Sequence, residues 1–295
     1  MKNGKMKAAL LTALAAFPLL YACQQEDVFA TWRDPSKYVI QSEISSFTVM
    51  QYNIWGADSP WDSGRFDAVA GVINSQHPDF VSLNEVDSLT TRNPWFMCRE
   101  LAERTGMYYA YAVAIESDEW TRKGTYGDAI LSRYPIEEVR RFKLYPDPAQ
   151  GTVQKENRSV CAIRVDLSGK KVWIVTTHLD HRSNELSRIS QAGQLRTVVE
   201  SLDGSLVLCG DLNARPESRT MSIIFDYMEP QYPSPTSEYY TYPSKYNGQA
   251  QPSYMIDYIL LKKGEPTLRC ASYRVVNATA SDHCAVVATF KINEP

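Results

Sequence analysis

Side chains that can bind a cation or a phosphate recur in this sequence at the ends of predicted strands. Asn53, Glu85 and His178 each follow a run of strand-forming residues, and Asp211 and Asn213 follow another. Carboxylate, amide and imidazole groups together can hold a hard cation and contact a phosphate. Because strand ends in an α/β domain converge on one crevice, we expect these side chains to meet there.

Three further residues of this kind lie near the end of the chain. Asp257 stands in the run Met255-Ile256-Asp257, and the pair Asp282-His283 precedes the last predicted strand. Each residue alone has an ordinary explanation as a turn, a cap or a structural histidine. However, the chain has only four histidines, and His178 and His283 both lie beside acids at strand ends. One shared site explains this pattern better than chance.

The segments between these side chains predict alternating strands and helices. Phe66, Val69, Ala70 and Ile73 recur at helical spacing, and Gly106 follows the next predicted helix, as is typical of a helix end. The predicted strands are 47–52, 80–83, 129–131, 160–163, 172–175, 206–208, 256–261 and 285–290, and the predicted helices are 66–73, 94–105, 185–202 and 221–228.

Two β-rich halves with helices between the strands predict sheets that pack against each other with helices outside. Strands flanked by amphipathic helices need both faces covered.

The segment 227–254 is rich in Tyr, Pro and Ser and predicts a long loop, either a substrate wall or plain surface. Cys161, Cys209 and Cys284 lie inside apolar runs, which favours buried free thiols over a disulfide framework.

The N-terminus predicts export. Three lysines precede an apolar run over residues 8–22, and Cys23 after Ala22 resembles the lipidation site of bacterial lipoproteins, although an ordinary cleaved signal is the alternative. We therefore predict a signal peptide over 1–22, a linker from the lipid anchor over 23–44 and one domain over 45–295.

Without the three signal lysines, 28 of the 31 basic side chains remain against 34 acids, a net charge of −6. This balance disfavours tight, non-specific binding of nucleic acid.

The polar residues belong to a set of short motifs. The motifs are Gln51-Tyr52-Asn53-Ile54-Trp55, Leu83-Asn84-Glu85-Val86, Ala129-Ile130-Leu131-Ser132-Arg133-Tyr134-Pro135, Asn157-Arg158, Thr177-His178-Leu179, Gly210-Asp211-Leu212-Asn213, Ile256-Asp257-Tyr258-Ile259 and Ser281-Asp282-His283. With these motifs in this order, the sequence resembles the deoxyribonuclease I-like endonuclease/exonuclease/phosphatase superfamily from about Phe47 to Ile292. The resemblance implies a four-layer α/β/β/α sandwich of two mixed β-sheets packed face to face with helices outside.

The resemblance implies a Mg²⁺ or Mn²⁺ site with Glu85 as direct ligand and Asn53 and Asp282 nearby. Oxygen ligands suit such a cation. The implied reaction is in-line attack of water on phosphorus, with charge on the non-bridging oxygens stabilised by the site. The cofactor expected for the chain is therefore Mg²⁺ or Mn²⁺.

The resemblance also assigns roles to the remaining residues. Asp211 positions or deprotonates the attacking water, and Asn213 holds that water and donates to the phosphate. His178 and His283 hydrogen-bond the phosphoryl oxygens, and Asp257 orients His283. A further phosphate contact is expected from Arg158, whose planar fork suits bidentate binding, with a surface strand arginine as the alternative.

Some positions depart from the family pattern. Gly127-Asp128 stands where many relatives have Gly-Asn, and Asn84-Glu85 stands where Gln-Glu is commoner. Tyr126 is a candidate leaving-group acid by a loose alignment only. His181 either reaches the edge of the cleft or caps a loop, and the second reading is favoured.

The sequence leaves the substrate open. The expected activity is a phosphodiesterase acting on extracellular or periplasmic nucleic acid or a phospholipid headgroup, from a monomer anchored to a bacterial membrane. The alternatives are a phosphomonoesterase on inositol phosphates or similar compounds, or a lipid-anchored binding protein of the same fold without turnover. Fold alone does not separate these functions.

Overall fold

The computed structural model describes residues 43–57, 60–116, 123–147, 156–234, 236–244 and 252–293, which form two six-stranded sheets. In the first sheet the order is β11-β12-β1-β2-β4-β3. The central pair β1 and β2 is parallel, and the other neighbours are antiparallel. Its strands are β1 (Ser46–Asn53), β2 (Phe80–Ser88), β3 (Tyr108–Glu116), β4 (Thr125–Ser132), β11 (Leu268–Val276) and β12 (Ala285–Ile292).

The second sheet repeats this plan. Its order is β5-β6-β7-β8-β10-β9, and the central pair β7 and β8 is again parallel. A helix connects the two strands of each parallel pair, as a parallel connection requires. Its strands are β5 (Ile136–Leu144), β6 (Arg158–Leu167), β7 (Lys170–His178), β8 (Ser205–Asp211), β9 (Met228–Pro230) and β10 (Asp257–Lys262).

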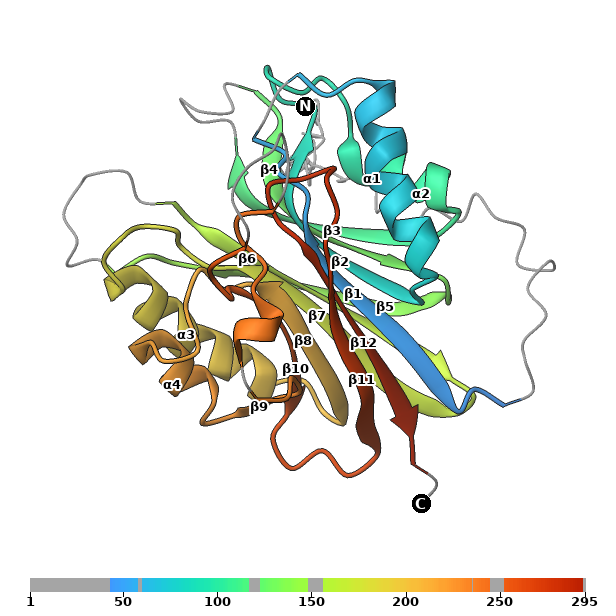
Figure 1. Cartoon of the computed structure of the whole chain (residues 1–295), viewed down its shortest axis with the longest axis vertical. Helices are drawn as coiled ribbons and strands as arrows, with labels where there is room; N and C mark the ends of the chain where they lie inside the picture. The colour runs from blue at the N-terminus through green and yellow to red at the C-terminus, as the bar shows by residue number, and fades with distance from the viewer. Residues whose placement is uncertain are drawn as a thin grey trace, which may run out of the picture.

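Helices cover the outer face of each sheet, which gives four layers (Figure 1). The first sheet carries α1 (Ser63–Gln76) and α2 (Met97–Thr105), and the second carries α3 (Leu186–Glu200) and α4 (Arg219–Ile224). The apolar side chains predicted at helical spacing in α1 are buried against the first sheet. A short 3₁₀ helix, η3 (Thr236–Tyr239), lies in the tyrosine-rich loop.

The strands carry a different type of side chain on each face, because successive side chains point to opposite sides of a sheet. In β1, Met50 and Tyr52 pack toward the helices, whereas Phe47 and Val49 pack between the sheets. The next positions on that inner face are Gln51 and Asn53, both fully buried. The inner face of β1 therefore changes from apolar to polar toward the end of the strand.

The same change occurs in strands of the second sheet. In β8, Val207 and Cys209 belong to the core between the sheets, and Asp211 follows on the same face. In β10, Ile259 and Leu261 belong to that core, and Asp257 precedes them. Since these polar ends come together at one edge of the sandwich, the pattern of the strands itself creates a polar site there.

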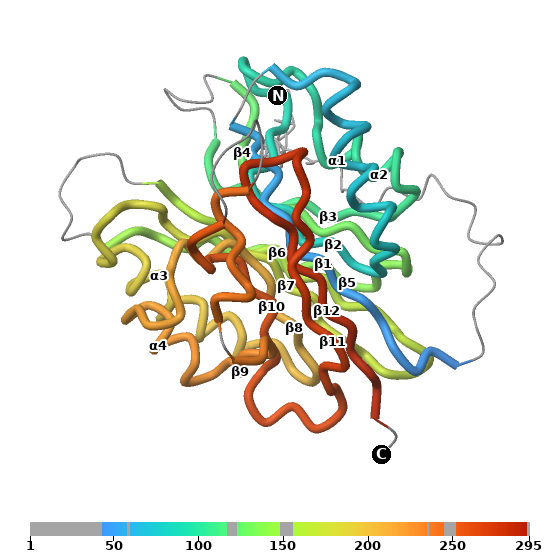
Figure 2. Tube along the Cα trace, viewed as in Figure 1, coloured from blue at the N-terminus to red at the C-terminus, as the bar shows by residue number. Residues whose placement is uncertain are grey.

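The first and last strands lie side by side, as the blue and red ends of the trace show (Figure 2). Ser46 pairs with Lys291 at one end of this ladder, and Gln51 pairs with Val286 near the other. His283 stands just before β12, and Asn53 ends β1. Sheet pairing therefore brings the two ends of the sequence to the same polar edge.

The sequence-based architecture is confirmed, including the sandwich and the helices outside it. The second helix begins at Met97 rather than at about residue 94, and Gly106 ends it in the left-handed conformation, as predicted. Cys98, Cys161, Cys209 and Cys284 are buried, and none of them forms a disulfide within the described residues. The signal segment, Cys23 and most of the linker lie outside the described residues. Within the described residues, no helix has the length and apolar character to cross a membrane.

Candidate active site

The predicted residues meet at one pocket of about 450 Å³ at the polar edge of the sandwich. Asn53 and Asp257 are fully buried and hydrogen-bond to groups that line the pocket. The predicted residues that line the pocket are Glu85, Arg158, His178, Asp211, Asn213, Asp282 and His283.

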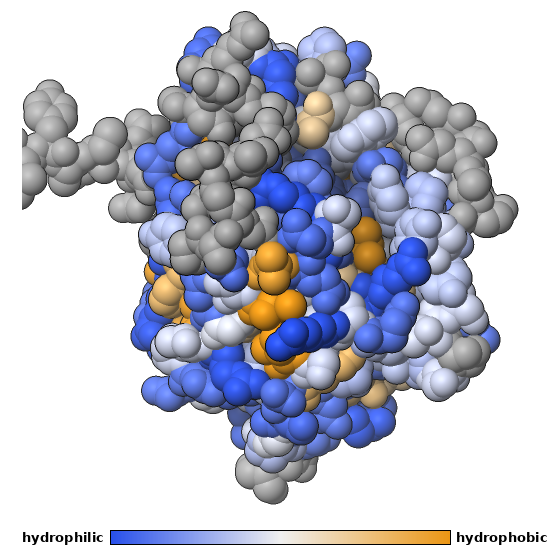
Figure 3. All heavy atoms as spheres, turned by 90° about the vertical axis from the view of Figure 1, so that its left-hand side faces the viewer, coloured by the Kyte–Doolittle hydropathy of each residue, from blue (hydrophilic) through white to orange (hydrophobic). Residues whose placement is uncertain are grey.

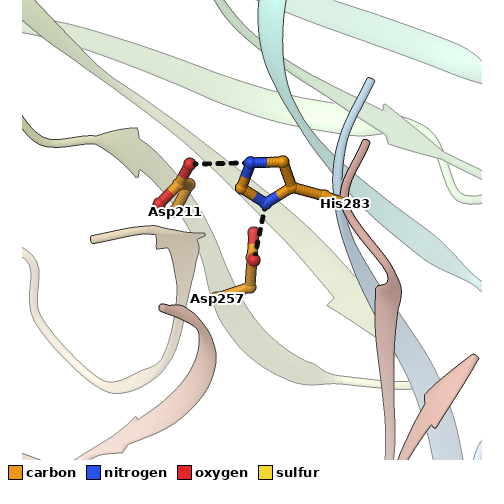
Figure 4. Close-up of side chains that lie close together, drawn as sticks. All are labelled: Asp211, Asp257 and His283. Carbon is orange, nitrogen blue, oxygen red and sulfur yellow. Dashed lines mark hydrogen bonds and ion pairs between the residues drawn. The ribbon is translucent and has the colours of Figure 1, made fainter. Parts of the chain in front are cut away.

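Asp257, His283 and Asp211 form a chain of charged groups (Figure 4). Asp257 Oδ2 lies 2.9 Å from His283 Nδ1, and Asp211 Oδ2 lies 3.7 Å from His283 Nε2. Burial disfavours the charged imidazole, but the carboxylates of Asp257 and Asp211 outweigh it and raise the pKa of His283 to about 10. His283 is therefore a cation at neutral pH, held with its Nε2 toward Asp211.

Asp211 occupies the centre of the site and is buried. Burial, and next the charge of Asp257, raise the pKa of Asp211 to about 7, while His283 and a hydrogen bond from Asn53 act in the opposite direction. A carboxylate with a pKa near neutral can accept a proton at the working pH of an ordinary enzyme. The geometry and the pKa of Asp211 together fit the base predicted from the sequence.

Glu85 is presented to the pocket by unusual backbone. It lies at the irregularity between Leu83 and Val86 in the β2–β4 pairing, and its φ of 63° is left-handed. A side chain at Gly56 would lie 1.8 Å from the Glu85 carbonyl oxygen, so only glycine fits there. Asn53 Nδ2 donates to Glu85 Oε1 at 3.1 Å and to Asp211 Oδ2 at 3.0 Å, and so fixes both carboxylates.

The charge of the site suits a divalent cation. Burial raises the pKa of Asp282 to about 6, His283 lowers it, and the nearby carboxylate of Glu85 raises it further. The four acids Glu85, Asp211, Asp257 and Asp282 thus outnumber the two buried cations at the site, the imidazolium of His283 and the guanidinium of Arg158. Oxygen donors with excess negative charge are the surroundings that Mg²⁺ and Mn²⁺ prefer.

A second possible metal-binding group consists of Asp211, Asp257 and His283, whose ligand atoms all lie within 4.8 Å of one another. In the structure, however, His283 Nδ1 is hydrogen-bonded to Asp257, whose other oxygen accepts from Gln51 Nε2 at 3.2 Å. A cation there would have to replace these bonds. Glu85 and Asp282, which line the pocket, are the better cation ligands.

His178 and Asn213 form the other side of the site. Asn213 Nδ2 lies 2.9 Å from His178 Nε2, and the Asn213 backbone donates to Asp211 Oδ1 at 2.9 Å. Burial, and then the charges of Arg158 and the other two site histidines, keep the pKa of His178 well below its usual value, so the ring is neutral. His178 Nδ1 is buried without a partner among the described residues, the kind of orphaned atom that a ligand can satisfy.

Arg158 stands at the wall beside His178 and is only 2% exposed. Its Nη2 donates to Glu156 Oε2 at 3.1 Å and lies 3.1 Å from His181 Nδ1. Burial acts against the guanidinium charge, but Tyr126, Glu156 and other acids raise the pKa of Arg158. The structure thus excludes the alternative of a surface strand arginine, and His181 reaches the pocket rather than only capping a loop.

The two departures from the family pattern interact with each other. Asn84 Nδ2 donates to Asp128 Oδ1 at 2.7 Å, and Asp128 Oδ2 accepts from Ser159 Oγ at 2.5 Å. Burial raises the pKa of Asp128 to about 6, although both hydrogen bonds lower it. Asp128 is 1% exposed and does not line the pocket, so it acts below the site rather than on a ligand.

Several pocket residues were not predicted from the sequence. Glu156, Trp55 and Tyr242 line the pocket, and the Tyr242 ring packs on His283 with centroids 4.8 Å apart. Gln51 does not line the pocket but supports Asp257 from below, and it could have been found, because it stands two residues before Asn53 on the same face of β1. Tyr242 lies in the irregular tyrosine-rich segment, where no periodicity marks it. Tyr126 lines the pocket and is buried, and it stays a candidate.

The fold and the site define a class of protein, and comparison with known sequences agrees with it. Residues 50–283 match the Endonuclease/Exonuclease/phosphatase family. The chain belongs to this family, whose members are phosphoester hydrolases. Among curated proteins it is similar to sphingomyelinase C of Leptospira interrogans, with 24% identity over 154 residues that cover 46% of this chain and 27% of that protein. The match therefore spans about a quarter of the relative.

Solved structures show the same fold. A family member from Beutenbergia cavernae superposes with a TM-score of 0.67 and 23% identity, covering 85% of this chain and 72% of the other. The mannosyl-6-phosphatase of Bacteroides thetaiotaomicron superposes with a TM-score of 0.61 and 16% identity, covering 83% of this chain and 99% of the other. The names of these relatives cover different substrates, so they leave the substrate of this chain open.

Proposed function

We propose that this protein is a divalent-metal-dependent phosphoester hydrolase, in the first place a phosphodiesterase, that uses water for in-line attack on phosphorus. The observation that carries the proposal is the placement of Asp211 in a single pocket. It lies between the imidazolium of His283, 3.7 Å away, and the amide of Asn53, 3.0 Å away. A base held between a cation and a fixed donor can orient and deprotonate water.

The neighbours of Asp211 act on the phosphate and on the water. His283 donates from Nε2 to a phosphoryl oxygen, and Asp257 keeps its ring oriented and protonated. Asn213 and His178 lie on the opposite side, where Asn213 holds the attacking water. Arg158 contributes a buried positive charge at the wall, which stabilises the charge that gathers on the phosphoryl oxygens.

Glu85, Asn53 and Asp282 would hold the Mg²⁺ or Mn²⁺ ion. When bound, the cation offsets negative charge on the phosphoryl oxygens and the leaving oxygen. Asn53 fixes Glu85 through its hydrogen bond, and its amide also restrains Asp211. The same amide therefore sets the spacing between the cation ligand and the base.

The place of action is proposed from the sequence. We propose that Cys23 carries a lipid and that the domain acts on the outer side of a bacterial membrane, on a phosphoester such as nucleic acid or a phospholipid headgroup. We also propose that it acts as a monomer. The net charge disfavours tight non-specific binding of nucleic acid. Labelling with an alkynyl fatty acid should be lost in Cys23→Ala, and labelling that persists would refute the anchor.

The activity is tested with the full chain in mild detergent, using bis-p-nitrophenyl phosphate with Mg²⁺ or Mn²⁺. Asp211→Asn and His178→Ala should each lower kcat by about 10²–10⁴-fold. The control is His77→Asn, which changes an exposed histidine after α1. Equal activity in Asp211→Asn and wild type would place the active site elsewhere. No turnover of any diester or monoester, with the cation bound, would favour the non-catalytic alternative.

A further inference from the structure

One aromatic residue of the pocket has no part in the proposed reaction. Tyr242 lines the pocket, and its ring centre lies 4.8 Å from that of His283, with the two ring planes at 45°. Aromatic rings pack on each other at separations of about 4.5–7 Å, so this pair is in close contact. Tyr242 also packs on Tyr254, with ring centres 6.5 Å apart, and the Arg215 guanidinium carbon lies 4.1 Å from the centre of the Tyr254 ring. A row of packed side chains therefore leads from the exposed Arg215 to His283 in the site.

The backbone beside this tyrosine is bound to both of the segments that bring acids of the site to the pocket. We call residues 241–244 the strap. Thr241 Oγ1 accepts from the Asp257 N–H at 3.3 Å, and the Ser244 N–H donates to the Asp282 carbonyl oxygen at 2.6 Å. Thr241 and Ser244 are both fully buried. The strap therefore gives the tyrosine ring a fixed position relative to the histidine on which it packs.

The imidazole of His283 needs support of this kind. Its Nδ1 lies 2.9 Å from Asp257 Oδ2 and its Nε2 lies 3.7 Å from Asp211 Oδ2, so only the first of these contacts is within hydrogen-bonding distance. A single hydrogen bond at one nitrogen leaves the ring free to tilt about that atom. A reacting group keeps its productive geometry when packing locks its side-chain rotamer. The Tyr242 ring supplies such packing.

The docking of a partner is another role that aromatic residues near a surface can have. The side of the molecule drawn in Figure 3 is mostly hydrophilic, with hydrophobic residues in one small group near its centre. Tyr254 is 37% exposed, whereas Tyr242 is half-buried and contacts His283 from within the pocket. The contacts of Tyr242 therefore favour a role in the reaction over a role in binding a partner.

We infer that Tyr242 is a positioning residue, whose ring keeps the His283 imidazole turned so that Nε2 points toward Asp211 and the phosphoryl oxygen. The inference rests on the proposed function and adds to the same site a residue that acts through His283. The hydroxyl group of Tyr242 has no part in this role, because the contact is between the two rings. Misplacement of a reacting group by about 1 Å can cost about 10²-fold in rate, so loss of the tyrosine ring should be visible in kcat.

The kinetic test uses the full chain in mild detergent, with bis-p-nitrophenyl phosphate and Mg²⁺. Tyr242→Leu removes the ring but keeps an apolar side chain. This change should lower kcat about 10–100-fold and change KM less than about threefold, because the contact acts on the transition state. Tyr242→Phe keeps the ring and should retain kcat within about twofold of wild type. Wild-type kcat in Tyr242→Leu, or an equal loss in Tyr242→Phe, overturns the inference.

A double-mutant cycle shows whether the effect passes through the imidazole. In the background of His283→Gln, the further change Tyr242→Leu should lower kcat less than about twofold, because residues that act as a unit have non-additive effects. If Tyr242→Leu causes its full loss of kcat again in that background, the tyrosine acts on another group and the inference is wrong.

The matched control is Tyr239→Leu, the same change in the same tyrosine-rich loop. The Tyr239 ring packs on Tyr232 and Tyr273, with ring centres 6.3 Å and 5.5 Å apart, and Tyr239 does not line the pocket. This control should lower the stability toward urea and leave kcat unchanged. A loss of kcat equal to that in Tyr242→Leu would assign the effect to the loop as a whole and remove the role of the Tyr242 ring.

Nuclear magnetic resonance of the protein with isotope-labelled histidine tests the contact without turnover. The imidazole C–H signals of His283, identified by their loss in His283→Gln, should shift in Tyr242→Leu and stay in place in Tyr242→Phe. Unchanged signals in Tyr242→Leu would contradict the contact. Absence of turnover in wild type removes the proposed hydrolase, whereas these spectra still decide whether Tyr242 orients His283. Wild-type turnover in Tyr242→Leu leaves the hydrolase standing and removes only the positioning role.

Discussion

Replacement of Asn84 by alanine should destabilise the domain and slow catalysis together. The Asn84 side chain is fully buried between the sheets. Its Nδ2 donates to Asp128 Oδ1 at 2.7 Å and to the Thr177 carbonyl oxygen at 3.1 Å. Its Oδ1 accepts from Gln51 Nε2 at 2.6 Å and from the Asp211 backbone N–H at 2.9 Å. One amide thus connects strands of both sheets directly below the base.

The expected loss follows from the groups that the change leaves without a partner. Gln51 keeps its contact with Asp257, but Asp128 Oδ1 and the Asp211 N–H lose theirs. A buried polar group without a partner costs about 1–3 kcal/mol, so the two together cost about 2–6 kcal/mol. Water that enters the vacated space offsets part of this cost, and we expect about 3 kcal/mol. That corresponds to a decrease in Tm of about 6–12 °C.

Unfolding in urea is monitored by tryptophan fluorescence, and kcat for the diester is measured on the same variants. The control is Asn74→Ala, which removes a single, partly buried contact between Asn74 Nδ2 and the Arg104 carbonyl oxygen at 3.3 Å. That control should cost under about 1.5 kcal/mol and leave kcat unchanged. A loss below about 1 kcal/mol for Asn84→Ala with wild-type kcat would refute the role assigned to this amide.

Four further predictions concern the reaction. The rate should rise as pH increases through about 7, because Asp211 must lose its proton. It should fall as pH increases through about 10, because His283 must keep its proton. A flat pH–rate profile would contradict both roles. Asp257→Asn removes the main charge that raises the pKa of His283, so the alkaline limb should move to lower pH and kcat should fall about 100-fold in stopped assays. Arg158→Lys should raise KM about 10-fold with a smaller effect on kcat, since the lysine keeps the charge but is shorter and lacks the planar guanidinium whose Nη2 lies 3.1 Å from both Glu156 Oε2 and His181 Nδ1; an unchanged KM would remove Arg158 from the binding site. Treatment with EDTA should abolish turnover, and Mg²⁺ or Mn²⁺ should restore it in wild type but much less in Glu85→Gln; turnover that persists in EDTA would exclude the cation.

The sequence was sufficient to predict the layers and the edge at which the site lies. Alternation along β1 separates Phe47 and Val49 from Met50 and Tyr52, so a two-residue period shows which side chains face the other sheet. Asn53 and Asp211 interrupt this pattern at strand ends. A polar residue on an otherwise apolar face must be satisfied by partners, and these residues satisfy one another.

Other parts of the site depend on tertiary contacts that no local pattern contains. Glu156 and Tyr242 reach the pocket from irregular segments far apart in the chain. The bond between Asn84 and Asp128 crosses 44 positions, so two unusual residues that each seemed a departure turned out to be partners. Helix ends differed by a few residues because capping, rather than periodicity, fixes them.

The pairing of Ser46 with Lys291 determines where on the domain the proposed lipid anchor would be attached. β1 runs from there toward Asn53, and seven steps of about 3.3 Å place Ser46 about 23 Å from the pocket end of the strand. A tether attached ahead of Ser46 would therefore join the domain at the end of β1 that lies farthest from the pocket. Attachment at that end would leave the pocket open to molecules that diffuse in from the surroundings.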